Sequence, residues 1–181
     1  MIVRPSLATD APALAAIYGH HVQHGFGTFE EIPPTPEDMA GRRAAIVERG
    51  LPYLVAEEAG QVLGFAYAGP FRPRAAYRYT VEDSVYVAPE AMGRGVGKAV
   101  LGEVLSACEA LGIRQVVAVI GDSGNAGSIA LHRALGFEPS GVGKSFGFKH
   151  GRWVDIVWMQ KALNGGDASG PDAPGLSLGG A

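Results

Sequence analysis

The sequence predicts an α/β fold, with a mixed central sheet flanked by helices on both faces. Two observations indicate it. Stretches with apolar residues at helical spacing alternate along the chain with short β-branched runs. One such run, QVVAVIG at 115–121, is apolar throughout, as in a strand that is buried on both faces. At 181 residues, the chain has the length of one domain with a full core.

The chain begins with a predicted strand and a predicted helix. Residues 2–5 are typical of a short strand. Thr9 and Asp10 then offer an N-cap for a helix that is rich in Ala, Leu and Ile and reaches about His24. The following residues, GFGTFEEIPPTP, interrupt this pattern with glycine and proline and predict a loop.

A second helix and a hairpin follow. Thr35, with Pro36 behind it and Asp38 three residues on, predicts a helix start. Residues 53–57 and 62–68 predict two strands, and the tight turn EAGQ between them makes them a hairpin. The sheet is therefore expected to be antiparallel where it begins.

The second half of the chain supplies the rest of the sheet. A loop at 70–78, rich in proline and arginine, leads into a strand at 80–87. A shorter helix at about 125–135 and strands near 138–143 and 153–161 close the fold. Between them, a longer helix is predicted by apolar residues at near-helical spacing: Val96, Val100, Val104, Cys108 and Leu111.

The end of the chain differs in composition from the rest. From Asn164 onward, NGGDASGPDAPGLSLGGA is rich in Gly, Ala, Pro and Ser and has no period. Such a segment buries too little apolar surface to order itself. We therefore expect one domain over residues 1–163 and a disordered tail over residues 164–181.

Charge and composition exclude several classes of protein. A net charge of −3 provides no general footprint for nucleic acid. The single Cys108 excludes an intrachain disulfide and a cysteine-based metal cage, which fits a reducing compartment. The chain contains no run of 18 apolar residues, and its start has no signal-peptide pattern. We expect a cytoplasmic protein that acts without a membrane or a nucleic acid.

A glycine-rich loop precedes the long helix. Gly93, Gly95 and Gly97 stand within PEAMGRGVGKAVL, and backbone N–H groups at such a helix start bind phosphate. A P-loop needs a hydroxyl residue after Gly97-Lys98, where this chain has Ala99. The dinucleotide fingerprint G-x-G-x-x-G fails in both possible frames. A loop that merely starts a helix remains the plain alternative.

The loop resembles the [Q/R]-x-x-G-x-[G/A] signature of the GNAT acetyltransferases, with Met92 where Gln or Arg is usual. Further on, NAGSIALHRALGF resembles a second segment of that family, with His132 where many members have a tyrosine. YTVEDSVYV and GFKHGRWVDIVWMQ resemble the phosphinothricin and methionine sulfoximine acetyltransferase subfamily. The resemblance extends over residues 2–163 and implies the GNAT fold.

The resemblance implies acetyl-CoA as co-substrate, held by the amides of the glycine loop and by the strand before it. It implies these acetyl-CoA-binding residues: Val85, Tyr86, Val87, Gly93, Arg94, Gly95, Val96, Gly97, Lys98, Asn125 and Ser128. No metal is expected. His20, His21 and His24 have no carboxylate partner in register, and we expect them on a surface or an interface.

Two residues are the predicted catalysts of acetyl transfer to an amine. Strand alternation places Glu82 and Ser84 on one face and Asp83 and Val85 on the other. The resemblance selects Glu82 as the general base, against the alternative of a strand acid that faces solvent. His132 would donate a proton to the departing sulfur, unless it is a histidine on a helix surface.

The acceptor is expected to be a small amino acid or analogue, such as phosphinothricin or methionine sulfoximine or sulfone, acetylated directly in a ternary complex. Arg72 and Arg74 would bind its carboxylate, unless they are simply solvated. The remaining predicted substrate contacts are Phe29, Pro73, Glu82, Asp83 and Ser84. Two other functions stay open: acetylation of a protein N-terminus or lysine, and a CoA-binding regulatory module without turnover.

The last predicted strand is apolar on both faces. Trp153 and Val157 share one face, and Val154, Ile156 and Trp158 share the other. A terminal strand of this kind needs extra cover, either from a helix of the same chain or from a second chain. Resemblance to the subfamily, whose members form two-fold dimers, indicates a homodimer with contacts around residues 149–153.

Overall fold

The computed structural model describes residues 1–178. Within them, seven strands form one sheet in the order β1-β2-β3-β4-β5-β7-β6. Only the pair β4–β5 is parallel among these residues, and the others are antiparallel. This confirms the mixed sheet that is antiparallel at first. The strands are β1 (Ile2–Pro5), β2 (Tyr53–Glu58), β3 (Gln61–Pro70), β4 (Thr80–Val87), β5 (Gln115–Gly121), β6 (Glu138–Lys149) and β7 (Arg152–Ala162).

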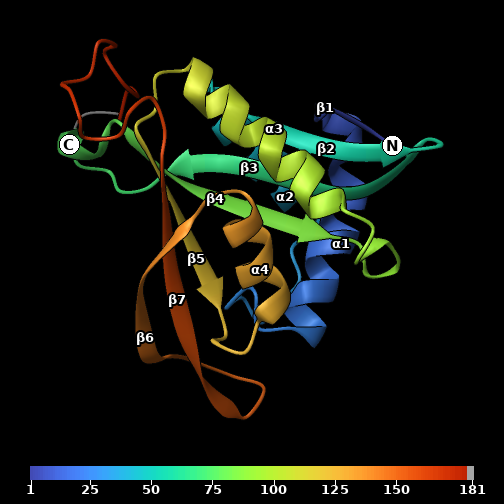
Figure 1. Cartoon of the computed structure of the whole chain (residues 1–181). Coiled ribbons are helices and arrows are strands. Elements are labelled where there is room, and N and C mark those ends of the chain that lie inside the picture. Colours follow the sequence, from blue (N-terminus) through green and yellow to red (C-terminus); the bar gives the residue numbers. More distant parts are fainter. Residues whose placement is uncertain (179–181) are drawn as a thin grey trace.

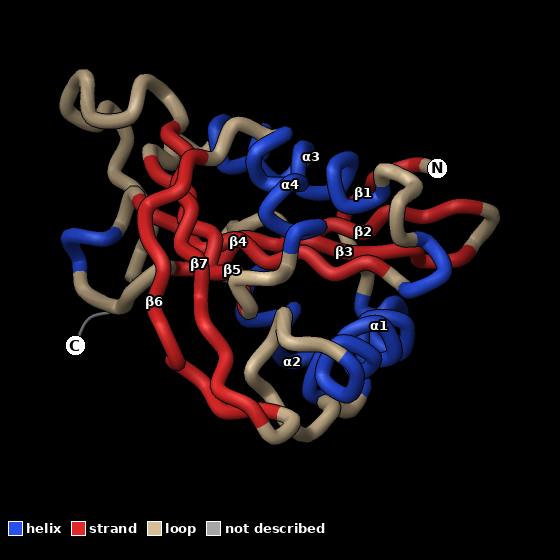
Figure 2. The backbone as a smooth tube through the Cα atoms, turned by 60° about the horizontal axis from the view of Figure 1, so that its bottom comes forward, coloured by secondary structure: helices blue, strands red, loops and turns tan. Residues whose placement is uncertain are grey.

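Helices cover both faces of the sheet, as predicted. In Figure 2, α1 (Ala11–His24) and α2 (Pro36–Val47) lie on one side of the strands, and α3 (Val96–Ala110) and α4 (Ala126–Ala134) lie on the other. The buried apolar side chains of α3, among them Val100, Leu101 and Val104, pack against the strands. Cys108 is buried in the same core, and burial raises the pKa of its thiol to about 12, so it remains protonated at neutral pH.

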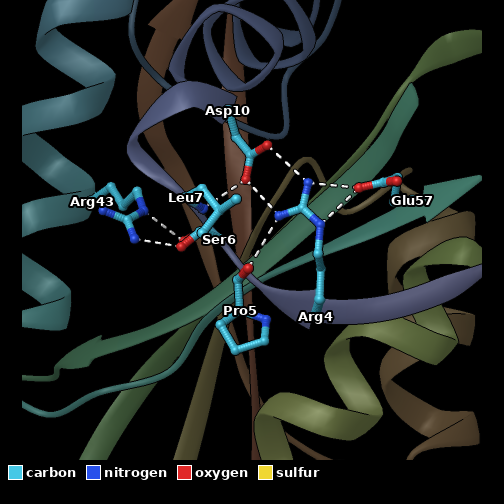
Figure 3. Close-up of polar contacts among 7 residues, drawn as sticks. All are labelled: Arg4, Pro5, Ser6, Leu7, Asp10, Arg43 and Glu57. Carbon is cyan, nitrogen blue, oxygen red and sulfur yellow. Dashed lines mark hydrogen bonds and ion pairs between the residues drawn. The ribbon is translucent and has the colours of Figure 1, made fainter. Parts of the chain in front are cut away.

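The predicted helix starts differ in how they are held. At α2, the Thr35 hydroxyl accepts a hydrogen bond from the Asp38 amide at 3.1 Å, and the Asp38 carboxylate accepts one from the Thr35 amide at 3.0 Å. The two bonds form a capping box at the predicted helix start. At α1, by contrast, the Asp10 carboxylate makes no cap. Arg4 donates two hydrogen bonds to it, at 2.8 and 2.9 Å, and the Leu7 amide donates another at 2.7 Å (Figure 3). Asp10 therefore ties the start of α1 to β1.

The two central strands separate beyond their first residues. Thr80–Asp83 of β4 pair with Gln115–Ala118 of β5, and the strands then diverge, with α4 lying across the opening (Figure 1). The backbone edges of residues 84–87 and 119–121 face this opening. A gap in the middle of a sheet leaves strand edges that a ligand can use.

The final hairpin is longer than predicted. β6 runs to Lys149, beyond the predicted end at residue 143. Its register with β7 shifts between Gly143 and Gly147, where the sequence GKSFG has no strand pattern. Pairing with the strongly apolar β7 holds this segment in the sheet, which is a tertiary effect that local pattern cannot supply.

Residues 164–178 lie against the domain. Arg114 donates hydrogen bonds to the carbonyl oxygens of Gly166 and Ser169, at 2.7 and 2.8 Å, and the Tyr79 hydroxyl donates to Ala173 at 2.8 Å. The division of the chain at residue 163 and the disorder of the tail remain predictions. Within the described part of the chain, no helix is long and apolar enough to cross a membrane.

Candidate active site

A cleft of about 790 Å³ opens where β4 and β5 separate. Its walls come from residues 82–87 of β4, residues 118–121 of β5, the glycine loop, α4, and the loop after α1. Because the gap runs through the sheet, the cleft reaches from the side of α3 and α4 to the side of α1 and α2. Two molecules can therefore meet in it from opposite sides.

The glycine loop forms the entrance of the cleft on the α3 side. Gly93 and Gly95 have φ angles of 76° and 80°, in the left-handed region that residues with a Cβ rarely adopt. A Cβ added at either position would meet nothing within 4 Å, so the space above the loop is open. Gly95 caps α3 without a side-chain hydrogen bond, and the first amides of the helix have no partner inside the helix. These residues fit the binding of a diphosphate.

Side chains of β4 alternate between the two ends of the cleft. The Tyr86 ring lies 4.7 Å from that of Tyr18 in α1, and Glu82 and Ser84 share this face. Asp83 points the other way, toward His132 of α4. The predicted alternation of Glu82 against Asp83 is therefore confirmed, and the two predicted catalysts approach the cleft from opposite faces of the sheet.

Glu82 is a half-buried carboxyl in the cleft wall. Burial raises its pKa, the charge of Arg72 partly opposes this, and the neighbouring Asp83 adds to it. A carboxyl with a raised pKa is a better proton acceptor than an ordinary surface glutamate.

His132 and Asp83 form a buried pair. The side chains are 3% and 1% exposed, and His132 Nε2 lies 3.0 Å from Asp83 Oδ2. His132 Nδ1 lies 2.7 Å from the Ser128 carbonyl oxygen, so Nδ1 carries a proton that it donates there. A second proton must then lie between Nε2 and Oδ2. The alternative of a histidine on a helix surface is wrong.

The environment favours keeping that proton in the pair. Burial lowers the pKa of His132, but the hydrogen bond and charge of Asp83 outweigh it and raise the pKa overall. Burial raises the pKa of Asp83, although the hydrogen bond from His132 opposes this. Asp83 Oδ1 is buried and has no hydrogen-bond partner among the described residues.

Comparison with known proteins places this geometry in a family. Residues 19–137 match the model of the acetyltransferase (GNAT) family. The chain is 53% identical to a phosphinothricin N-acetyltransferase of Alcaligenes faecalis, over 90% of this chain and 83% of that protein. It is 42% identical to an L-methionine sulfoximine/L-methionine sulfone acetyltransferase of Pseudomonas paraeruginosa, over 90% and 94%.

A solved structure agrees with these relatives. The GNAT superfamily phosphinothricin acetyltransferase of Sinorhizobium meliloti, crystallised with AcCoA, is 50% identical, with a TM-score of 0.90 over 94% of this chain and 92% of that one. This chain belongs to the GNAT acetyltransferase family. The GNAT fold implied by the sequence resemblance is thereby confirmed, and the acetyl-CoA that the resemblance also implies is bound in that solved relative.

Most of the predicted acetyl-CoA-binding residues of this GNAT acetyltransferase line the cleft. Arg94 does not, because it forms an ion pair with Glu58 at the surface. Asn125 caps α4, accepting a hydrogen bond from the Ser128 amide at 3.2 Å. Those in the cleft wall are Val85, Tyr86, Val87, Gly93, Gly95, Val96, Gly97, Lys98, Asn125 and Ser128.

The predicted acceptor-binding residues divide into two groups. Phe29, Glu82 and Ser84 line the cleft. The wall of the cleft does not include Arg72, Pro73 or Arg74. The Arg72 guanidinium instead stacks over the Phe71 ring, 4.4 Å from its centroid. Asp83 lines the cleft too, but its carboxylate faces His132 and lies on the opposite face of β4 from Glu82.

Two residues that hold the site together were expected elsewhere. His21 Nε2 lies 2.9 Å from the Val87 carbonyl oxygen, at the end of β4, and burial lowers the pKa of its ring. Lys149 is 2% exposed and donates hydrogen bonds to the carbonyl oxygens of Gly25 and Thr28, at 2.9 and 2.8 Å. Lys149 therefore fixes the loop that carries Phe29. Sequence spacing carries no signal for such contacts, which join residues 66 positions apart for His21 and more than 120 apart for Lys149.

No metal centre accompanies these groups in the described part of the chain. Residues 1–178 contain no cluster of three or more His, Cys, Asp or Glu side chains that could hold a metal ion. His20 and His24 lie against each other on α1, with ring centroids 4.7 Å apart.

Proposed function

We propose that this GNAT acetyltransferase moves the acetyl group of acetyl-CoA to the α-amino group of a small amino acid or analogue, of the phosphinothricin and methionine sulfoximine or sulfone type. The observation that carries the proposal is a cleft that passes through the sheet, with the glycine loop at one end and Glu82 at the other. The names of the relatives at 53% and 42% identity support the choice of acceptor.

The glycine loop and the open edge of β4 would hold acetyl-CoA, which supplies the activated acetyl thioester. The unpaired amides at the start of α3 and the positive end of the helix dipole suit a diphosphate. Lys98, in the cleft wall, adds a cation. Met92 provides no polar side chain, but the backbone donors do not depend on it.

Glu82 would accept the proton that the amine loses as its nitrogen forms the new bond to the acetyl carbon. The raised pKa of Glu82 suits this step, which proceeds directly or through one water. Arg72 lies close enough to Glu82 to act on its pKa. A carboxylate held by Arg72 would therefore stand beside an amine held at Glu82.

The Asp83–His132 pair would donate a proton to the sulfur of CoA as the carbon–sulfur bond breaks. Both ring nitrogens of His132 already make hydrogen bonds, Nδ1 to the Ser128 carbonyl oxygen and Nε2 to Asp83. To donate its Nε2 proton to the sulfur, the imidazolium must therefore turn Nε2–H away from Asp83 and toward the cleft. The Asp83 carboxylate then remains to attract the next proton. We therefore propose that the acid is the pair rather than His132 alone.

Direct measurement of acetyl transfer tests the function. Thiol release from acetyl-CoA should require L-methionine sulfone, L-methionine sulfoximine or phosphinothricin, and mass spectrometry should find one acetyl group on the α-amine. Turnover with peptides bearing free N-termini or lysines, and none with the amino acids, would contradict the proposal. Binding of acetyl-CoA without any turnover would indicate a regulatory module.

We also propose that the protein is a homodimer. β6 is the last strand of the described sheet, and the β6–β7 hairpin carries the exposed side chains of Phe146, Phe148 and Trp153, which are 61%, 57% and 62% exposed. Such a group of large apolar side chains on one hairpin fits a contact with a second copy. Lys149 points inward, so Trp153 and its neighbours would form the contact within residues 149–153.

Sedimentation equilibrium at micromolar concentration checks the assembly. We expect a species of twice the 18.8 kDa of one chain. Trp153→Ser should shift the equilibrium toward the single chain, because it removes a large exposed apolar group. Tyr77→Ser, which also removes an exposed aromatic side chain but lies outside the hairpin, serves as the control. A wild-type protein that sediments as one chain would refute the dimer.

A further inference from the structure

A second cavity lies on the α1 and α2 side of the sheet. It has a volume of about 250 Å³ and is lined by Tyr18, Met39, Arg42, Ile46, Tyr53 and Tyr67. These residues come from α1, α2, β2 and β3. The walls are aromatic and aliphatic, and Arg42 is 45% exposed and paired with Glu30. A mostly apolar cavity with one charged residue in its wall is typical of a pocket for a small organic group.

One polar group of this cavity has no partner. Tyr53 is 3% exposed, and its hydroxyl is buried without a hydrogen bond to any described residue. The hydroxyl of Tyr18, in contrast, is bonded to Thr28 and Glu30, at 2.8 and 2.9 Å. A buried hydroxyl without a partner is unfavourable, and a ligand oxygen that accepts its proton would relieve this.

The cavity is aligned with the acceptor end of the cleft. Tyr53 pairs with Tyr67 across β2 and β3, and Tyr67 pairs with Ser84 across β3 and β4. The rings of Tyr53 and Tyr67 stack at 4.8 Å, and both Ser84 and Glu82 lie near enough to Tyr67 to act on its pKa. Since neighbouring strands are about 4.8 Å apart, β2 lies roughly 10 Å from β4. An amino-acid side chain spans most of that distance.

We propose that this cavity receives the side chain of the acceptor amino acid, and that the Tyr53 hydroxyl donates a hydrogen bond to an oxygen at its end. An amine at Glu82 would place the side chain across Tyr67 and toward Tyr53. The chemical class is a straight side chain that ends in an oxidised sulfur or phosphorus: a sulfone, sulfoximine or phosphinate. This inference rests on the proposed function and specifies how it selects its substrate.

Paired acceptors test the hydrogen bond. L-Methionine sulfone carries two oxygens on sulfur, and L-methionine has the same chain without them. Tyr53→Phe should lower kcat/KM for the sulfone about three- to tenfold, mainly through KM, and change that for methionine less than twofold. Tyr79→Phe is the matched control, because the Tyr79 hydroxyl bonds Ala173 near the chain end and should not distinguish the two acceptors.

A second variant tests the cavity by filling it. Ile46→Phe adds bulk to the α2 wall, and we expect it to raise KM for the sulfone and for methionine while KM for acetyl-CoA stays constant. If the wild type acetylates the sulfone, but Tyr53→Phe leaves the preference unchanged and Ile46→Phe leaves both acceptor KM values unchanged, the pocket assignment is wrong and the function stands. If the wild type acetylates neither acceptor, the proposed function fails first.

Discussion

Glu82→Gln is expected to lower kcat by roughly 10²–10⁴, the range for loss of a positioned general base. The amide has the shape of the carboxyl but cannot accept the proton of the attacking amine. Affinity for acetyl-CoA should change little, because the loop at the start of α3 does not involve Glu82. Steady-state kinetics with L-methionine sulfone and calorimetric titration of acetyl-CoA measure the two quantities separately.

The dependence of the reaction rate on pH tests whether Glu82 is the general base. A base must be deprotonated to work, so wild-type activity should fall as pH decreases through the pKa of Glu82, which burial raises above the usual glutamate value. This acid limb should vanish in Glu82→Gln. Glu103→Gln, an exposed position on α3, is the control and should leave both rate and profile unchanged. Wild-type rates in Glu82→Gln would require another base.

Asp83→Asn should lower kcat by about 10², the lower end of the range for a proton-transfer group. The variant keeps the size of the side chain but removes the carboxylate that holds the proton against His132 Nε2. Since Asp83 raises the pKa of His132 and burial alone lowers it, the imidazole should lose its proton at a lower pH in the variant. The basic limb of the pH–rate profile should therefore move to lower pH.

A double variant distinguishes a role of Asp83 in proton transfer through His132 from a purely structural role of Asp83. If Asp83 acts through His132, the double variant Asp83→Asn/His132→Asn should be about as slow as the slower single variant, because groups that act as a unit are not additive. Thermal unfolding followed by circular dichroism shows whether each variant is folded. A folded Asp83→Asn protein with an unchanged basic limb and kcat within twofold of wild type would refute the pairing.

Much of the fold follows from local pattern. The apolar run of β5, the apolar spacing of α3 and the helix start at Thr35 each depend on residues close together in sequence. The structure has these elements where they were predicted. β6 is the exception. Its second half contains a register shift at Gly143–Gly147, and only pairing with β7 makes it a strand.

The candidate site divides in the same way. Alternation along a strand has a period of two, so the sequence alone separated Glu82 from Asp83. The glycine spacing by itself predicted a phosphate site at the start of α3, because backbone freedom is a local property. Which side chains these residues contact, in contrast, depends on segments that are far apart in sequence. Nothing in the spacing relates Asp83 to His132, 49 positions away, or Lys149 to the loop that carries Phe29.

The sequence by itself therefore determined the family and the order of the elements, and it predicted the glycine loop as a phosphate site and β4 as the strand of the base. The tertiary structure alone decided that His132 shares a proton with Asp83 and that Arg94 forms an ion pair with Glu58. It also decided that the Tyr53 hydroxyl, which has no hydrogen-bond partner among the described residues, borders a second cavity. The physical reason is range. Torsional preference and apolar period act over a few residues, whereas hydrogen bonds, burial and pKa values depend on which distant segments the packed sheet brings into contact.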